Sequence, residues 1–174
     1  MKQQCIVAIL LVLGPFVCAQ DESKVALGAG AEFNMNARKY FAGGAALALD
    51  FTLPRAFAIG VSATASFNAA LTAVEAAALA RRYFGSVGFF AQADAGAILY
   101  MEDMYRDGPL QALFSGGLRL GFRLTPDIVP PSAATWYIEP YARGGYPFLF
   151  SVGVLAGVRF VPREKQTVGD VINR

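Results

Sequence analysis

The sequence contains no histidine, and both of its cysteines, Cys5 and Cys18, lie among the first 18 residues. Histidine is the commonest general base and metal ligand of proteins, and a cysteine thiolate is a frequent alternative nucleophile. We therefore expect no enzyme activity, no catalytic residues, no cofactor and no metal site. A mature chain that begins after Cys18 also lacks any disulfide.

An excess of either charge is missing as well. The chain has 15 basic and 13 acidic residues, and loss of Lys2 with a leader would leave 14 against 13. Proteins that bind nucleic acid usually present a surplus of basic residues to the phosphates. A nucleic-acid partner is therefore not expected.

Long hydrophobic runs are absent beyond the N-terminal segment, although 55% of the residues are hydrophobic. The longest uncharged stretch, from Ala56 to Val74, is interrupted by Ser62, Thr64 and Ser66 among others. A membrane-spanning helix needs about 20 mostly apolar residues. Hydrophobic residues spread over alternate positions instead favour strands of a membrane barrel, with an apolar outer face and a polar interior.

The N-terminus has the three parts of a secretory signal peptide. Lys2 precedes an apolar run from Cys5 to Val17, and small Ala19 ends it. We expect residues 1–19 to be removed after export by the Sec route. In a competing interpretation Cys18 carries a lipid anchor, but bulky Val17 disfavours a lipobox.

Apolar and polar residues alternate along eight segments, which predicts strands. The third segment is the most regular, whereas the fourth, which includes Glu75, is rich in helix-forming alanine. We predict a strand there too because bacterial single-chain barrels have an even number of strands. The predicted fold is all-β: an eight-stranded antiparallel up-and-down transmembrane β-barrel over residues 20–160, followed by a polar tail at 161–174. The expected strands cover about 24–35, 41–53, 57–68, 72–84, 89–101, 110–124, 136–146 and 149–160.

Segment length and aromatic placement agree with this prediction. Membrane strands run to about 9 to 11 residues plus short extensions, and aromatic girdles mark both interfaces. The aromatic residues expected near strand ends are Phe33, Tyr40, Phe41, Phe51, Phe57, Phe67, Tyr83, Phe84, Phe89, Phe122, Trp136, Phe148 and Phe160. Connections are expected near 36–40, 69–73, 102–109 and 146–148 on the outer side, with a proline-rich connection at 125–135.

Two short motifs are characteristic: Tyr137-Ile138-Glu139-Pro140-Tyr141, and the closing Gly157-Val158-Arg159-Phe160. With them, the chain resembles the small eight-stranded outer-membrane barrels of diderm bacteria, the group of OmpA membrane domains, OmpX and OmpW. The resemblance implies an outer-membrane location with both termini periplasmic. It also implies contact with lipopolysaccharide or other outer-leaflet lipid and with the assembly machinery. The assembly signal would comprise Gly157, Val158 and Phe160.

Alternation also predicts which charged residues face the lumen. They are Lys24, Glu32, Asp50, Asp94, Arg119, Arg123, Glu139, Arg143 and Arg159, with Glu75 and one of Arg81 or Arg82. In one interpretation they form a buried network that closes the lumen. In the other, small neighbours such as Gly28, Gly121 and Gly157 leave space, and a polar path has its constriction at Glu32, Asp50, Asp94, Arg119, Glu139 and Arg143.

Pro140 has no N–H to donate within a strand, so it predicts a bulge or a weakened lateral seam that opens toward lipid. A lateral seam is what the resemblance to OmpW-like channels for apolar solutes implies.

For the function, the sequence predicts a narrow passive channel for small or apolar solutes, or a structural envelope protein, by default a monomer. The alternatives are a closed barrel acting as a surface adhesin or host-interaction protein, which the short loops disfavour, and a soluble lipocalin-like binder. Outer faces rich in alanine and valine disfavour the last of these.

Overall fold

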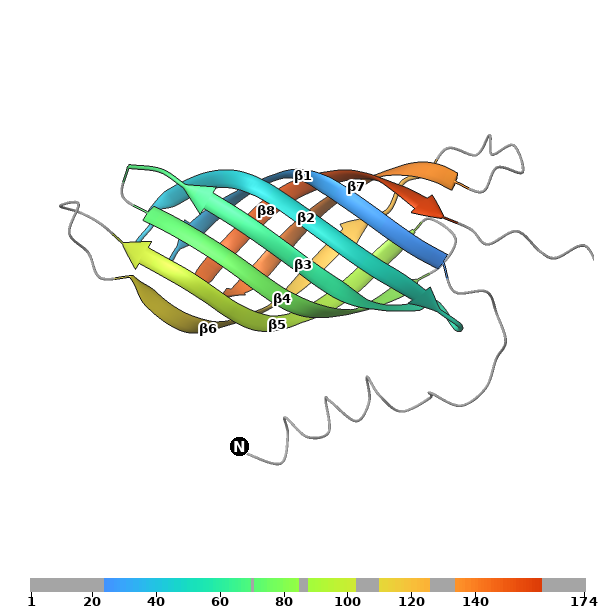
Figure 1. The fold of residues 1–174 in the computed structure, drawn as a ribbon, viewed down its shortest axis with the longest axis horizontal. Helices are drawn as coiled ribbons and strands as arrows, with labels where there is room; N and C mark the ends of the chain where they lie inside the picture. Colours follow the sequence, from blue (N-terminus) through green and yellow to red (C-terminus); the bar gives the residue numbers. More distant parts are fainter. Residues whose placement is uncertain (1–23, 70, 85–87, 103–109, 126–133, 161–174) are drawn as a thin grey trace, which may run out of the picture.

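The computed structural model describes residues 24–69, 71–84, 88–102, 110–125 and 134–160. These residues form one closed β-barrel (Figure 1). Its eight strands are β1 (Lys24–Asn36), β2 (Phe41–Leu53), β3 (Phe57–Phe67), β4 (Leu71–Phe84), β5 (Phe89–Glu102), β6 (Gln111–Phe122), β7 (Ala134–Tyr146) and β8 (Phe148–Phe160). The predicted signal peptide and polar tail lie outside the described residues.

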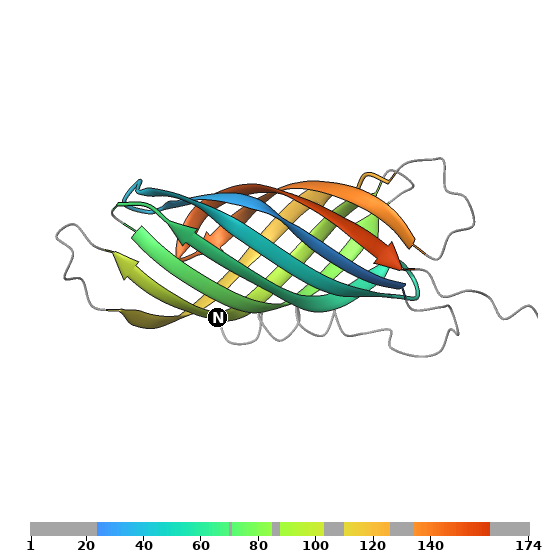
Figure 2. The same ribbon diagram turned by 45° about the horizontal axis from the view of Figure 1, so that its top comes forward.

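Each strand pairs antiparallel with its neighbours in the chain, and β1 closes the barrel against β8. Leu27 lies opposite Val158 and Phe33 opposite Val152 across this closing ladder. The strands are strongly tilted, as the view turned by 45° also shows (Figure 2). The predicted eight-stranded antiparallel up-and-down barrel is therefore confirmed. No helix long and apolar enough to span a bilayer occurs in the described ranges.

The fourth strand illustrates why alternation prevails over helix propensity. Glu75 and Leu79 lie on the inner face and are 3% and 4% exposed. Val74, which directly precedes Glu75, lies on the outer face and is 49% exposed. β4 pairs along its length with β3 and β5. Pairing on both sides and burial of one face stabilise the strand more than the local preference of alanine for helix destabilises it.

Two aromatic residues differ from their predicted position in an outer girdle. Phe148 is 3% exposed and lies inside, because the ladder between β1 and β8 shifts register between Met35 and Asn36 and turns the first residue of β8 inward. Tyr83 also packs against inner-face residues, since it shares the phase of Arg81 in β4. By contrast Phe33, Phe51 and Trp136 are exposed on the outer wall, as expected.

The barrel has two distinct ends. We call the end where Lys24 begins β1 and Phe160 ends β8 the terminal end, and the opposite one the distal end. A tight turn at Pro54-Arg55 joins β2 and β3 at the terminal end, where Arg55 and Ala56 adopt positive φ angles of 64° and 62°. β6 ends at Phe122 and β7 begins at Ala134, so the end of one strand and the start of the next each lie two residues before the predicted position.

Candidate functional site in the barrel lumen

The inner faces of the strands bring most of the buried charge into two clusters. The terminal cluster comprises Asp50, Arg81, Gln92, Arg123 and Glu139, and the central cluster comprises Glu32, Glu75, Asp94, Arg119 and Arg143. All ten side chains belong to residues that are at most 5% exposed. Gln92 connects the clusters, because its amide donates to Asp94 (3.4 Å).

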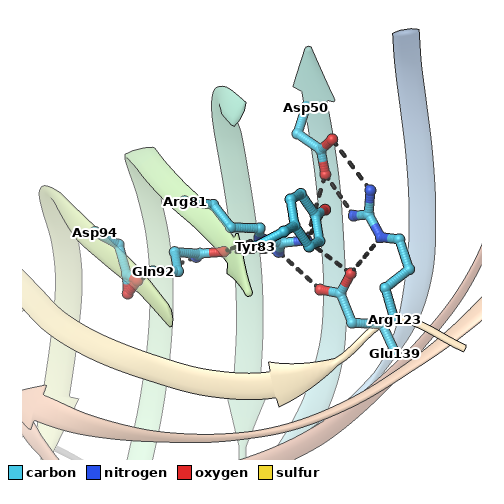
Figure 3. A network of polar contacts seen from close by, with 7 residues as sticks. All are labelled: Asp50, Arg81, Tyr83, Gln92, Asp94, Arg123 and Glu139. Atoms are coloured by element: carbon cyan, nitrogen blue, oxygen red, sulfur yellow. Dashed lines mark hydrogen bonds and ion pairs between the residues drawn. The ribbon is translucent and has the colours of Figure 1, made fainter. Parts of the chain in front are cut away.

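The terminal cluster is organised around Glu139 of β7 (Figure 3). Arg81 donates through both terminal nitrogens to the two Glu139 oxygens, each at 2.7 Å, and Arg123 Nε donates to Oε2 at 2.8 Å. Asp50 accepts from Arg123 Nη2 at 2.6 Å and lies 3.6 Å from Arg81 Nη1. Two arginines therefore share two carboxylates across the lumen.

The central cluster is organised around Arg143. Its two terminal nitrogens donate to Glu75 at 2.8 and 2.6 Å, and its Nε lies 2.8 Å from Asp94 Oδ2. The contact between Arg143 Nε and Asp94 Oδ2 is an ion pair but not a hydrogen bond. Neither of these two atoms has a hydrogen-bond partner among the described residues, which indicates that their angle falls outside hydrogen-bond geometry. Arg119 lies 3.8 Å from Glu32, which accepts a 2.7 Å hydrogen bond from the Tyr141 hydroxyl.

Three of the four buried arginines also stack on an aromatic ring. Arg81 lies 4.0 Å from the ring centroid of Phe90, Arg119 4.0 Å from Tyr141, and Arg123 4.3 Å from Tyr137. A desolvated cation gains from the ring quadrupole. The rings therefore compensate part of the cost of burying these arginines and hold each guanidinium in one orientation.

The space beside four of the lumen glycines is occupied by these same aromatic side chains. A Cβ added at Gly28 or Gly157 would collide with Tyr137, one at Gly153 with Tyr141, and one at Gly121 with Phe90. The expectation that glycine leaves an open path is therefore wrong at these positions. Glycine provides the room into which a neighbouring ring folds.

An apolar layer lies toward the distal end of the lumen. It consists of Ala42, Leu71, Ala73, Ile98, Tyr100 and Phe148. The rings of Tyr100 and Phe148 are 6.2 Å apart, and Asn36 donates to the Tyr100 hydroxyl at 2.8 Å. The described interior thus passes from charged and aromatic layers to an apolar one along its axis.

The six predicted constriction residues are all buried in the lumen, but they do not form one ring. Glu139 and Asp50 belong to the terminal cluster, while Glu32, Asp94, Arg119 and Arg143 belong to the central one. The prediction placed Glu75 and Arg81 less firmly, and the structure gives both of them direct ion pairs. The phase of β4 is the signal that selects Arg81 for the lumen and Arg82 for the outer wall.

Among the described residues that are at most 5% exposed, the charges do not balance. Five carboxylates (Glu32, Asp50, Glu75, Asp94 and Glu139) face four arginines (Arg81, Arg119, Arg123 and Arg143). Each buried charge has at least one opposite charge within 3.8 Å. Within the described residues, no group of three or more acidic side chains is arranged to hold a metal ion.

Pro140 lies on the outer face of β7, where it interrupts the ladder with β6 without a bulge. Gly121 pairs with Tyr141 and Leu124 with Ile138, so the register continues unchanged past Pro140. Leu124 and Ile138 exchange both backbone hydrogen bonds, at 2.8 and 2.9 Å. Hydrogen-bonded pairs recur at every second residue of an antiparallel ladder, so Pro140 occupies the next hydrogen-bonding position toward β6. It has no N–H to donate there. The predicted bulge is therefore wrong.

The β6–β7 ladder is also the shortest in the barrel. It pairs six residues of each strand, against ten or more in each of the other seven ladders. The reason at the distal end is that β7 stops at Tyr146, opposite Gly116, so β6 residues 111–115 extend beyond it.

The predicted assembly signal occupies the end of β8. Val158 and Phe160 are exposed on the outer wall, and Gly157 faces Tyr137 inside. Phe160 pairs with Val25 of β1 and Ala134 of β7. Its role in assembly stays a prediction.

The barrel is similar in fold to solved structures of small bacterial outer-membrane proteins. No protein-family model matches the sequence, and no curated protein matches it either. Neisserial surface protein A superposes with a TM-score of 0.53 at 14% identity, covering 79% of this chain and 96% of that one. The N-terminal β-barrel domain of Pseudomonas aeruginosa OprF gives a TM-score of 0.55 at 13% identity, covering 80% and 98%. These are small eight-stranded outer-membrane barrels, so the expected resemblance is confirmed for the fold.

Proposed function

We propose that the protein is a closed outer-membrane β-barrel that spans the bilayer as a structural element of the envelope and conducts no ions through its lumen. Its outer wall supports the membrane location. Leu47, Val61 and Leu118 are 54%, 55% and 69% exposed there, and outward apolar side chains at alternate positions suit contact with acyl chains.

The main observation in favour of a closed lumen is the bidentate ion pair between Arg81 and Glu139, which joins β4 to β7 across the lumen. An eight-stranded barrel has an interior that side chains can fill. To pass this level, an ion would have to separate the buried charges of Arg81 and Glu139. Buried groups have little water nearby to replace a lost partner. That separation is costly, on the order of 3–5 kcal/mol for a single buried pair.

Two further layers support closure. Arg143 joins Glu75 and Asp94 in the central cluster, and Phe148 packs with Tyr100 in the apolar layer. A route for ions would have to cross all three levels. Together with the absence of histidine, this filled interior supports a role without catalysis.

The proposed setting follows from the fold. Both ends of the described barrel chain lie at the terminal end, which faces the periplasm in this proposal. Outer-leaflet lipid would surround the distal half of the wall. The outer-membrane assembly machinery would recognise the end of β8, and the barrel would act as a monomer.

The test is conductance in planar lipid bilayers. We expect the wild-type protein to leave the bilayer at its basal conductance, and a Glu139→Ala, Arg81→Ser double variant, which opens only one of the three levels, to do the same. A variant that adds Arg143→Ser and Phe148→Ala, and so opens all three levels, should give discrete channel steps. Arg55→Gln, on the exposed turn, is the control variant. Steady channel openings of the wild type would contradict the closed state, and a wild-type protein that stays in water without detergent would contradict the membrane location.

A second candidate function is passage of small apolar solutes sideways between β6 and β7. The short ladder beside Pro140 favours it. Uptake of an apolar solute by vesicles that is lost when a disulfide joins Leu120→Cys to Ala142→Cys, which lie opposite each other, would support this route. Unchanged uptake after the cross-link would exclude it.

A further inference from the structure

The outward-facing strand positions whose exposure is described carry one charge. Among the strand residues whose exposure is described, Arg82 is the only charged side chain that faces outward; the other strand charges lie at inward positions. Arg82 forms no ion pair with another described residue and stacks instead on two rings, 5.3 Å from the centroid of Phe57 and 5.5 Å from that of Phe84. A cation on an apolar membrane wall calls for an anionic neighbour.

Arg82 stands at the end of a groove in that wall. The groove has a volume of about 270 Å³ and is lined by residues of β3 to β6. Its floor consists of Ala80, Ala91 and Ala93, and Leu118 and Leu120 of β6 form one side. Leu118 and Leu120 are 69% and 54% exposed, so they stand above the alanine floor.

The floor continues toward the middle of the barrel. Ala78 pairs with Ala95, and Ala76 with Ala97, in the same β4–β5 ladder. From Arg82 to Ala76 is six residues, or about 20 Å at about 3.3 Å per residue. An extended acyl chain can lie along such a track, with its head at Arg82.

The depth of Arg82 identifies what its charge meets. Phe84, Phe89 and Phe122 form a row of rings at the terminal end, with centroids 5.9 and 5.2 Å apart. Aromatic rows of this kind lie at the level of lipid headgroups. Arg82 is two residues from the end of β4, within reach of a headgroup phosphate, and guanidinium binds phosphate through paired hydrogen bonds.

We propose that this groove is a binding site for one anionic phospholipid, with the headgroup phosphate on Arg82 and an acyl chain on the alanine floor of β4 and β5. The inference rests on the proposed membrane location. It adds a specific lipid site to a wall that otherwise contacts lipids without selection.

Native mass spectrometry of the detergent-solubilised full-length protein tests the site, with phosphatidylglycerol as the probe and phosphatidylcholine for comparison. We expect one phosphatidylglycerol to be retained preferentially, and Arg82→Gln to weaken its binding about tenfold, since one charge-assisted interaction is lost. Arg55→Gln, which removes an exposed cation at the same end, should leave binding unchanged.

A second pair of variants tests the groove itself. Ala93→Leu fills the floor and should also weaken phosphatidylglycerol binding, whereas Ala45→Leu, at an outward alanine of β2, should not. Each variant is first checked for a folded barrel by the heat-dependent shift of its band on a gel.

Four results would overturn the proposal. Equal binding of both lipids, or no effect of Arg82→Gln, would mean that Arg82 only extends into the interfacial water. A dimer in detergent that Ala93→Leu dissociates would make the groove an interface between two copies. A wild-type chain that forms no heat-modifiable barrel in detergent or vesicles would refute the membrane location as well, which distinguishes that failure from the other three.

Discussion

Arg81 on β4 and Glu139 on β7 face each other across the lumen and form two parallel hydrogen bonds of 2.7 Å between side chains that are fully buried. Glu139 also accepts from Arg123 at 2.8 Å, so one carboxylate serves two guanidinium groups. Removal of one member of such a group leaves the others charged and without compensation. We therefore expect the terminal cluster to contribute a large part of the stability of the barrel and, in the proposed function, to close one of the three levels of the lumen.

Substitution of Glu139 by Gln should destabilise the barrel by about 3–5 kcal/mol, because the shape is kept while Arg81 and Arg123 lose their shared charge. Urea unfolding in lipid vesicles measures this, with the single tryptophan, Trp136, as the fluorescent reporter. Arg55→Gln on the exposed turn should change the free energy of unfolding by no more than about 0.5 kcal/mol. A loss below 1 kcal/mol for Glu139→Gln would contradict the role assigned to this carboxylate.

The central cluster predicts an order of effects. Arg143→Met leaves the buried carboxylates of Glu75 and Asp94 without their cationic partner, so it should lower the free energy of unfolding by about 3–5 kcal/mol. Glu75→Gln leaves Arg143 paired with Asp94 at 2.8 Å and should cost less, about 1–3 kcal/mol. Arg143→Lys should fall between them, because one ammonium cannot bind both carboxylates with the same geometry. The same unfolding measurement checks the order, and a reversed order would show that Glu75 does not depend on Arg143.

Two tyrosines of β7 form a matched pair for a hydroxyl deletion. The Tyr141 hydroxyl donates to Glu32 at 2.7 Å, whereas the Tyr137 hydroxyl is buried without a hydrogen-bond partner among the described residues. Tyr141→Phe should therefore destabilise by about 1–3 kcal/mol, and Tyr137→Phe should be neutral or slightly stabilising. Equal effects of the two deletions on urea unfolding would argue against the Glu32 contact.

Pro140→Val should close the gap in the β6–β7 ladder, because valine restores an N–H that faces Phe122 and suits an outward strand position. We expect a gain of about 0.5–1.5 kcal/mol from one added hydrogen bond. Hydrogen exchange should show slower exchange of the amides of Leu124 and Ile138, which flank the gap on this ladder. Ile138→Val is the control, and unchanged protection with Pro140→Val would show that the ladder is already closed there.

Alternation determined seven of the eight strands and the face of nearly every residue, whereas the remaining strand, the alanine-rich segment around Glu75, was predicted from the even strand number of bacterial barrels. Within that strand, a one-residue phase decides whether a side chain meets the lumen or the outer wall. The same phase separates Arg81 inside from Arg82 outside. A closed barrel of consecutive strands needs little more than this period and turns such as Pro54-Arg55.

The tertiary structure decided which residues meet inside. Period two gives a face but no height along the barrel axis, and height depends on the register of all eight ladders together. That register brings Arg81 to Glu139 and Arg143 to Glu75, 58 and 68 residues apart in sequence. It also lets Tyr137 and Tyr141 fill the space beside Gly28 and Gly153, and it turns Phe148 inward at an irregular pair. The set of side chains that meet in the lumen is therefore a property of packing between distant strands, which no local pattern contains.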